Sequence, residues 1–360
     1  MDIQKTVYKP EVYNMNNQDE YSLFQTFKDT HKDVTYINTL GEQKHELMLV
    51  RDPSLISHDA LGSGQNIPTE ENEGVWVYFP WRNTAVRILP EGEYSELRLS
   101  RNKNLITQDE QTMLAKSCIA IAGLNVGNPG AICIALEGIS NNIKLADFDP
   151  LSVSNLNRFR AGLPDLGVNK AYISARQIYE INPYAKIEVY GDGITNDNME
   201  SFLNNPKIDI LVEETDNLKL KVSMREQARK LKIPVVMVTG NGENVIVDIE
   251  RYDLEPELPL LAGYLDDIVL EGISKVKAGE GTYQERIDLA RDFMGVEYLD
   301  SRLVSSFGEV GKTLAGIPQL AESSFLRGAT IAHFTKKILL REPLVSGRYV
   351  VLLSGSHLGK

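Results

Sequence analysis

One segment constrains the fold more than any other: 118-CIAIAGLNVGNPGAICIALEG-138 joins an apolar run, a glycine turn and a second apolar run. The first run predicts a strand that ends at Gly123, and the pattern from Pro129 to residue 138 predicts a helix. A strand that passes through a glycine turn into a helix is typical of dinucleotide-binding folds. Asn125, however, stands where the second glycine of G-x-G-x-x-G is expected. The segment is therefore a dinucleotide site, another nucleotide site, or only a tight turn.

Strands and helices alternate after this segment. Helical patterns cover 168–182 and 217–232, and a short one lies near Met199. This alternation predicts an α/β fold in which a mainly parallel sheet carries helices on both faces. Ligands of such sheets bind where loops leave the carboxyl ends of the strands, which here carry Gly123, Asp147, Asp149 and Asp216. The predicted strands after the glycine turn are 143–149, 187–191, 208–212, 234–240 and 244–250.

The first part of the chain reads as a separate unit. Residues 75–90 hold both tryptophans and predict two strands around Pro80, an aromatic core hairpin. The glycine-rich and acidic stretch 58–74 predicts a surface loop. We therefore divide the chain into a small N-terminal α/β domain, residues 1–95, and a second domain, residues 96–360. No chemistry is indicated for the first domain.

Composition excludes several classes of function. The net charge of −12 argues against sequence-independent binding to nucleic acid. No apolar run is long enough to cross a bilayer, and the N-terminus lacks the apolar core of a signal peptide. Cys118 and Cys133 are the two cysteines, which excludes a disulfide scaffold and fits a cytoplasmic location. The five histidines show no H-x-x-x-H pair, so we expect no transition-metal site.

Several motifs favour a phosphate-bearing ligand, although each has a structural alternative. Asn128 and Pro129 fit the N-cap and the first residue of a helix. One interpretation is that the free N–H groups of that first turn bind phosphate. The alternative is that the two residues serve only the geometry of the turn. Asp147 is placed to accept ribose hydroxyl groups, whereas Asp149 could instead cap the following turn. Thr107 and Glu110 are expected to form a capping box at the start of a helix.

A basic cluster lies beside these carboxylates. Arginine and lysine side chains that converge on one pocket suit a triphosphate, and a solvated basic face is the alternative. Asp216, at another strand end, suits Mg²⁺ next to phosphate oxygens, or it caps the helix that starts near Asn217. The members of the cluster are Asn155, Asn157, Arg158, Arg160 and Lys170.

These motifs, taken in order, resemble the ThiF/MoeB adenylyltransferases, which are related to the adenylation domains of ubiquitin-activating enzymes. The resemblance runs from about residue 97 to residue 353, and it closes with a helix and strand in 317–353. The N-terminal unit is similar to that of a bacterial ThiF subgroup that is sometimes fused to a nitroreductase-like domain. The motifs are 98-RLSRN-102, 146-ADFDPLSVSNLNR-158, 165-DLGVNK-170 and 212-VEETDN-217.

The resemblance implies a Rossmann-like ThiF adenylation domain and a role for each matching residue. It assigns Asp216 to Mg²⁺. It also implies that Arg101 reaches across a homodimer to the ATP of the partner, with a local surface ion pair as the alternative. The paired C-x-x-C motifs of many relatives are absent, and no cysteine follows Cys133. The residues assigned to ATP are Asp147 for the ribose, Gly123, Asn125 and Gly127 in the phosphate loop, Asn155, Arg158 and Lys170 for the phosphates, and Asp149 beside them.

The implied activity is the Mg²⁺- and ATP-dependent adenylylation of a carboxylate by an enzyme that binds neither nucleic acid nor a membrane. That carboxylate belongs to the C-terminus of a small ubiquitin-like carrier protein or to a small carboxylic acid. Without a late cysteine, the activated acyl group would pass directly to another nucleophile. Two rival classes stay open: a non-catalytic nucleotide-binding or scaffold protein, and an NAD-dependent oxidoreductase.

Overall fold

The computed structural model describes residues 6–57, 66–265, 267–275 and 282–353, which fall into two compact units. One unit comprises Met1–Gln111 with Ala175–Ala185, and the other comprises Thr112–Ser174 with Lys186–Lys360. The predicted domain boundary between residues 95 and 96 stays a prediction. Within the described ranges, no helix is both long and apolar enough to cross a membrane.

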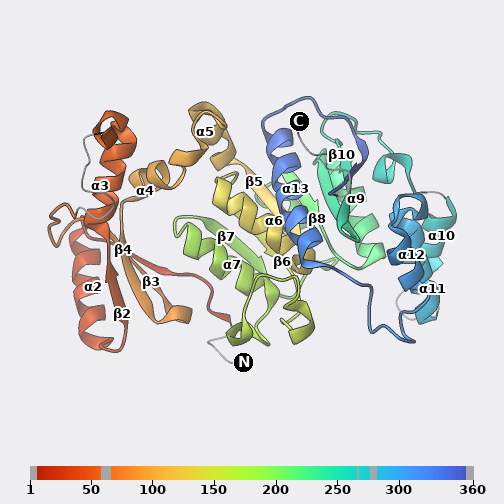
Figure 1. The fold of residues 1–360 in the computed structure, drawn as a ribbon, viewed down its shortest axis with the longest axis horizontal. Coiled ribbons are helices and arrows are strands. Elements are labelled where there is room, and N and C mark those ends of the chain that lie inside the picture. Colours follow the sequence, from red (N-terminus) through yellow and green to blue (C-terminus); the bar gives the residue numbers. More distant parts are fainter. Residues whose placement is uncertain (1–5, 58–65, 266, 276–281, 354–360) are drawn as a thin grey trace. The chain divides into compact units, whose positions relative to one another are not determined.

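The N-terminal unit is built on a mixed four-stranded sheet with the order β1-β3-β4-β2 (Figure 1). Its elements are β1 (Glu11–Asn14), α2 (Gln18–Thr30), β2 (Thr35–Asn38), α3 (Leu40–Arg51), β3 (Val75–Phe79), β4 (Thr84–Ile88) and α4 (Glu91–Arg98). The predicted aromatic hairpin is confirmed, because β3 and β4 pair antiparallel and Trp76 packs in a core with Phe24. Part of the predicted loop 58–74, residues 58–65, lies outside the described residues.

The second unit is built on a seven-stranded sheet with the order β11-β10-β9-β8-β5-β6-β7. Two helices are shared between the two units. Helix α5 (Gln108–Lys116) begins in the N-terminal unit and ends in the second unit, whereas α7 (Lys170–Ile181) begins in the second unit and ends in the N-terminal unit. Its strands are β5 (Cys118–Ala122), β6 (Asn142–Ala146), β7 (Lys186–Tyr190), β8 (Ile210–Glu213), β9 (Val235–Asn241), β10 (Asn244–Glu250) and β11 (Gly347–Val351). Its other α-helices are α6 (Leu124–Glu137), α8 (Met199–Asn204), α9 (Leu218–Leu231), α10 (Asp267–Lys275), α11 (Tyr283–Met294), α12 (Ser301–Phe307) and α13 (Ala321–Leu339).

The predicted α/β fold with a mainly parallel sheet is confirmed. Strands β9, β8, β5, β6 and β7 run parallel, while β10 pairs antiparallel with both β9 and β11 at one edge. The direction reverses between β9 and β10 because the two strands are joined by a tight turn in which Gly242 takes a φ of 62°. The predicted closing helix and strand are α13 and β11.

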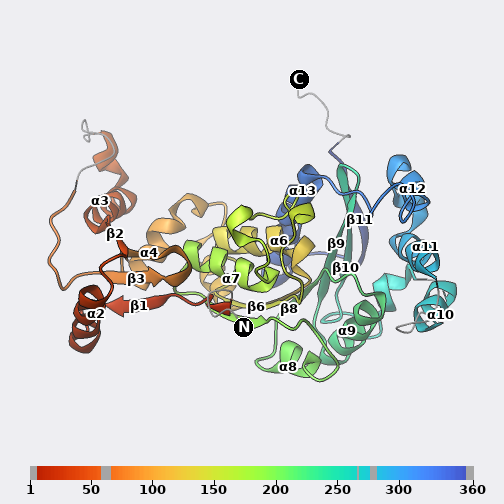
Figure 2. The same cartoon turned by 90° about the horizontal axis from the view of Figure 1, so that it is seen from below.

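Helices cover both faces of this sheet, as predicted. Figure 2 shows α8 and α9 on one side of the sheet and α6 and α13 on the other. On the first side, Phe202 and Met224 pack against Ala120 of β5. On the second side, a Cβ atom added to Gly130 of α6 would lie 2.7 Å from Ile331 of α13. The two helices therefore pack closely enough to require glycine, and this packing fixes α13 beside the start of α6.

The predicted capping box at the start of α5 is also confirmed. The backbone N–H of Thr107 donates to Glu110 Oε2 at 2.7 Å, and the N–H of Glu110 donates to Thr107 Oγ1 at 3.3 Å. Each side chain thus satisfies an amide group that the first helical turn leaves without a partner.

Candidate functional site

A single residue, Gly123, forms the turn between β5 and α6. Gly123 has a φ of 86°, and a Cβ atom there would lie 2.4 Å from the carbonyl oxygen of Glu214. Only glycine fits this position, because it combines a left-handed backbone with close contact to a neighbouring strand end. Gly127 lies one turn into α6, where an added Cβ atom would meet Ile121 at 2.7 Å. Its missing side chain is therefore accounted for by packing against β5.

The predicted helix start at Asn128 and Pro129 is wrong. Helix α6 begins at Leu124 with Gly123 as its N-cap, and Pro129 lies inside the helix. The helix starts early because the left-handed Gly123 turns the chain in a single step. Asn128 is fully buried and donates from Nδ2 to Ser174 Oγ at 2.9 Å, so it packs against α7 rather than capping α6.

The first free amide of α6 is held by a carboxylate from the next strand. Asp147 Oδ2 accepts the N–H of Leu124 at 2.6 Å, and its Oδ1 accepts the N–H of Asp149 at 2.8 Å. Burial raises the pKa of Asp147, while these two backbone hydrogen bonds oppose the rise. Lys170 is buried and donates from Nζ to Asp149 Oδ2 at 3.1 Å. Four of the predicted residues therefore lie around the turn: Gly123, Asp147, Asp149 and Lys170.

The basic loop after β6 is tied to the segment that leads into α13. Asn157 Nδ2 donates to the carbonyl oxygen of Gln319 at 3.0 Å, and Ser324 Oγ donates to that of Arg158 at 2.9 Å. The guanidinium of Arg160 lies 4.2 Å from the ring centre of Phe325. Asn155 accepts the N–H of Ser152 at 3.1 Å, so its side chain folds back on its own loop.

A cavity of about 780 Å³ lies at the ends of β5, β8 and β9. It brings Asn125, Arg158 and Asp216 together, so three predicted residues share one wall. Asn125 Oδ1 and Arg158 Nε are buried and have no hydrogen-bond partner among the described residues. Burial lowers the pKa of Arg158, and the charge of Asp216 opposes that change. Buried polar atoms without partners are rare, so this wall is suited to a polar ligand.

Asp216 is exposed at the edge of the cavity, and it does not cap α9. The N-cap of α9 is Asn217, whose Oδ1 accepts the N–H of Leu220 at 3.0 Å. The capping alternative for Asp216 is therefore wrong. Its carboxylate accepts no hydrogen bond from the described residues, and Asp216 lines the cavity.

Two residues of the cavity were missed by the sequence analysis. Arg327 of α13 is 3% exposed, and its Nε is buried without a partner. Glu214, the residue after β8, is buried and accepts the N–H of Val238 on Oε1 at 2.6 Å. Burial raises the pKa of Glu214 to about 8, although the charge of Lys221 opposes this. Spacing offered a signal for Arg327, because it lies four residues before Ile331 on the buried face of α13.

A buried ionic cluster supports the end of β8 next to Glu214. Arg225 of α9 is fully buried and forms ion pairs with Glu213 and, from Nε to Oε2 at 2.7 Å, with Glu250. Lys221 Nζ donates to Glu213 Oε2 at 3.1 Å. Burial alone would raise the pKa of Glu213, but the charges of Lys221 and Arg225 lower it to about 2. The neighbouring carboxyl groups Glu213 and Glu214 thus have opposite tendencies to ionise.

Arg101 belongs to the N-terminal unit. It lies exposed in the short helical turn Ser100–Asn102, outside the unit that holds the cavity. Its proposed reach into the site of a partner subunit stays a prediction.

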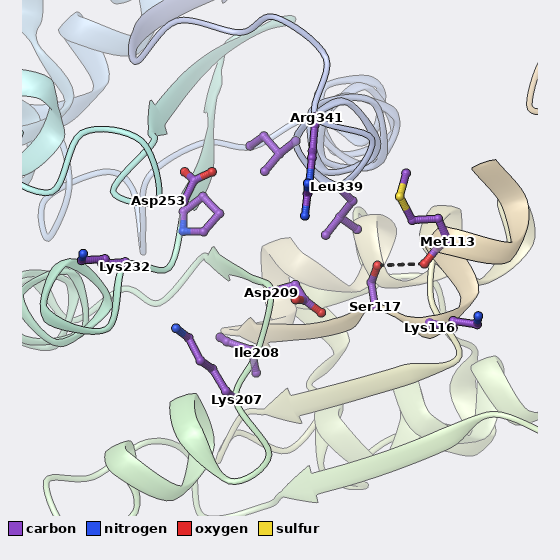
Figure 3. A pocket seen from close by; sticks show the side chains of 12 residues that line it. Met113, Lys116, Ser117, Lys207, Ile208, Asp209, Lys232, Asp253, Leu339 and Arg341 are labelled. Carbon is purple, nitrogen blue, oxygen red and sulfur yellow. Dashed lines mark hydrogen bonds between the residues drawn. The ribbon is translucent and has the colours of Figure 1, made fainter. Parts of the chain in front are cut away.

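A second cavity, of about 440 Å³, lies at the opposite, amino ends of β5, β8 and β9 (Figure 3). Lys116, Lys232 and Arg341 in its lining follow or end helices α5, α9 and α13. Positive charge is favoured at helix C-termini, which accounts for these residues without a ligand. None of the predicted site residues lines this cavity.

The second unit is a doubly wound α/β domain of the kind that binds ligands at the carboxyl ends of its strands. Residues 99–247 match the sequence model of the ThiF family, so this part of the chain is a ThiF-family domain. The family interpretation of the motifs is thereby confirmed.

Comparison with individual proteins agrees with this family. An uncharacterized protein of Mycobacterium tuberculosis is 37% identical over 281 residues, which are 78% of this chain and 38% of that protein. The tRNA threonylcarbamoyladenosine dehydratase of Escherichia coli is 30% identical over 135 residues, which are 37% of this chain and 50% of that protein. Molybdopterin-synthase adenylyltransferase of Haemophilus influenzae is 28% identical over 173 residues, which are 46% of this chain and 67% of that protein.

The crystal structure of the Escherichia coli dehydratase has a TM-score of 0.50 and 21% identity over 68% of this chain and 95% of that chain. This likeness shows that the two proteins share a fold. In the sequence comparisons, the chain spans 38% of the length of the Mycobacterium tuberculosis protein and 50% of that of the Escherichia coli dehydratase.

Proposed function

We propose that the ThiF domain binds ATP in the cavity beside α6 and transfers the adenylyl group to a carboxylate. The observation that carries the proposal is the polar wall, where Asn125 and Arg158 have buried atoms without partners among the described residues. Arginine side chains and the first N–H groups of a helix are strong ligands for phosphate. The name of the Haemophilus influenzae relative, an adenylyltransferase, supports the same chemistry.

We assign ATP to the residues around the glycine turn and to the basic loop. Asp147 would accept a ribose hydroxyl, since a carboxylate after the second strand is placed for that bond. The backbone of Gly123 and Gly127, with Asn125, would lie along the phosphates. Arg158, Lys170 and Asn155 would supply the opposing charge and hydrogen bonds. Lys170 would exchange part of its contact with Asp149 for a phosphate oxygen.

Asp216 fits a magnesium ion that is shared with the phosphates. Among the described residues, no group of three or more His, Cys, Asp and Glu side chains could hold a metal ion. Mg²⁺ often takes only one or two carboxylates and completes its shell with phosphate oxygens and water. A single exposed aspartate beside the cavity is therefore sufficient. The ion would neutralise charge on the phosphates.

The reaction follows from this arrangement. An oxygen of the substrate carboxylate attacks the α-phosphorus of ATP, the bond from that phosphorus to the bridging oxygen breaks, and pyrophosphate leaves. Arg158 stabilises the charge that develops at the phosphorus, and the fixed loop keeps it in place. Since no cysteine follows Cys133, the acyl adenylate reacts directly with the final nucleophile.

We infer the substrate class and the oligomeric state from the family. The carboxylate is that of a ubiquitin-like carrier protein or of a small acid, and the chain acts as a homodimer in which Arg101 completes the site of the partner. The relatives bear the names of different activities, so the choice of substrate must come from the cavity of this chain.

Trapping with hydroxylamine tests the activity. The protein is incubated with Mg²⁺, ATP, a candidate carrier or acid, and hydroxylamine, and AMP and acyl hydroxamate are measured. Adenylylation releases the two in equal amounts. ATP with Mg²⁺ should also raise Tm more than NAD does, because a ligand that binds only the folded state stabilises it. Stabilisation by ATP without AMP would favour a scaffold protein, and stronger stabilisation by NAD would favour an oxidoreductase.

A further inference from the structure

Arg327 is a buried arginine of the cavity that the ATP assignment does not use. Its guanidinium lies over Gly240 of β9, where an added Cβ atom would be 3.4 Å from Cζ. Nη2 donates to Gln319 Oε1 at 3.3 Å, and this is its one hydrogen bond with the described residues. The remaining donors of a side chain that is only 3% exposed are therefore available to a ligand in the cavity.

The position of Arg327 separates it from the phosphate end of the cavity. Phosphates that follow the start of α6 lie at the end of β5, whereas Arg327 contacts β9, and β8 stands between these strands. Two strand spacings amount to roughly 10 Å across the sheet. A group held by Arg327 therefore approaches the nucleotide from the side, as the second reactant must.

The cavity that Arg327 lines also has an apolar wall. It is formed by α10, α11 and the start of β9. Phe293, Ile273 and Met237 belong to one buried apolar cluster that continues behind this wall. Such a surface binds an apolar group and gives no hydrogen bonds to a polar one. The wall residues used here are Met237, Ile273, Ile287, Leu289, Ala290 and Phe293.

The surrounding charges suit a carboxylate better than a phosphate. The charges of Glu214 and Asp216 act on Arg327 and oppose the lowering of its pKa by burial, whereas Arg158 adds to that lowering. The carboxylate of Asp216 would repel a multiply charged phosphate more strongly than a singly charged carboxylate. A planar carboxylate also matches the fork of one guanidinium.

We propose that Arg327 binds the carboxylate that is to be activated and that the wall of α10 and α11 binds an apolar group next to it. The proposal rests on the proposed function and specifies its substrate class, a carboxylic acid with an apolar end. Gln319 positions Arg327, and Gly240 leaves room for its guanidinium.

Peptide binding to the 360-residue chain tests this assignment without turnover. The probes are dansyl-Gly-Gly-Gly-Phe as free acid, the same peptide as C-terminal amide, and dansyl-Gly-Gly-Gly-Gly as free acid, measured by fluorescence anisotropy. We expect the phenylalanine acid to bind about tenfold to a hundredfold more tightly than the amide, through a charge-assisted contact. It should also bind more tightly than the glycine acid by about tenfold or more, through apolar burial.

Two variants separate the anion receptor from the apolar wall. Arg327→Met should abolish the preference for acid over amide and leave the Kd of ATP within about threefold. Arg327→Lys, which keeps the charge, should restore part of the preference and guards against a loss caused by misfolding. Ala290→Phe should fill the space beside the apolar wall. Binding of the phenylalanine acid should then weaken by about tenfold, whereas binding of the glycine acid should not change.

Each result decides the assignment. Equal binding of acid and amide, binding of none of the peptides, or a loss of ATP binding in Arg327→Met with acid preference retained would overturn it. Binding of 4-phenylbutyrate as tight as the peptide would identify a small acid as the source of the carboxylate, and tighter peptide binding would identify a chain terminus. A protein that shows the peptide preferences but forms no AMP would contradict the proposed function and leave the assignment of Arg327 to a carboxylate intact.

Discussion

Glu214 allows the electrostatics of the site to be tested through stability alone. Burial raises the pKa of its carboxyl group from an ordinary value of 4.5 to about 8, against the charges of Lys221 and Arg327, while Glu213 adds to the rise. Between these two values the folded protein keeps a proton that the unfolded chain releases. Stability must therefore fall as the pH rises through this window, by about 1.4 kcal/mol per pH unit.

Glu214→Gln removes this dependence and nearly preserves the volume and the acceptor for the N–H of Val238. The variant should match the wild type near pH 5. By pH 7 it should be more stable than the wild type by about 2–3 kcal/mol, the effect of two pH units. This gain in stability is opposite in sign to the change expected when an ionised carboxylate in a salt bridge is lost.

Urea unfolding at pH 5, 6, 7 and 8 measures this difference directly, and it isolates Glu214 because every other titrating group is common to both proteins. Glu226→Gln, the same change at an exposed position of α9, serves as the control for the substitution itself. A Glu214→Gln protein that loses stability relative to the wild type as the pH rises would refute the reasoning.

Three further predictions concern the glycine turn, the ionic cluster and the dimer. Gly123→Ala should destabilise the protein by about 2–5 kcal/mol through backbone strain and contact with β8, whereas Gly162→Ala should change stability by less than about 0.5 kcal/mol; similar Tm shifts would contradict this. Arg225→Met should cost about 3–5 kcal/mol, because two buried carboxylates lose their partner, and thermal unfolding measures it. Inactive Arg101→Ala and Asp216→Ala proteins, mixed under subunit exchange, should recover roughly a quarter of wild-type activity; no recovery despite exchange would exclude a shared site.

The regular elements of the fold were predictable because their patterns repeat. The predicted strand at 118–122 agrees with β5, and the helix predicted over 217–232 agrees with α9 to within one residue at each end, since apolar runs and capping residues act locally. The start of α6 was not predictable from the same rules. Asn128 and Pro129 form a good helix start in isolation, but the left-handed Gly123 turns the chain five residues earlier. Tertiary packing of Gly127 and Gly130 then holds the proline inside the helix.

The candidate site was predictable only where residues follow the carboxyl ends of strands. Asn125, Arg158 and Asp216 meet at one cavity, as the topology implies. Arg327 lies more than a hundred residues later in the chain, on a helix whose apolar pattern identifies only a buried face. Its place over Gly240 depends on how α13 packs against β9, which no local spacing encodes. Nothing in the motif 212-VEETDN-217 distinguishes Glu214 from its neighbour Glu213, which ends the strand and forms the ion pairs.

Exchange of labelled pyrophosphate into ATP tests the central claim most directly, because it requires reversible adenylylation of a carboxylate. Wild-type protein with Mg²⁺ and a carboxylate substrate should incorporate label into ATP, and omission of the substrate should abolish incorporation. Asp216→Asn should lower the rate by roughly a hundredfold while the protein keeps its Tm, since one preorganised electrostatic group is lost. Exchange that is unaffected by Asp216→Asn, or no exchange by a protein that binds ATP, would contradict the account.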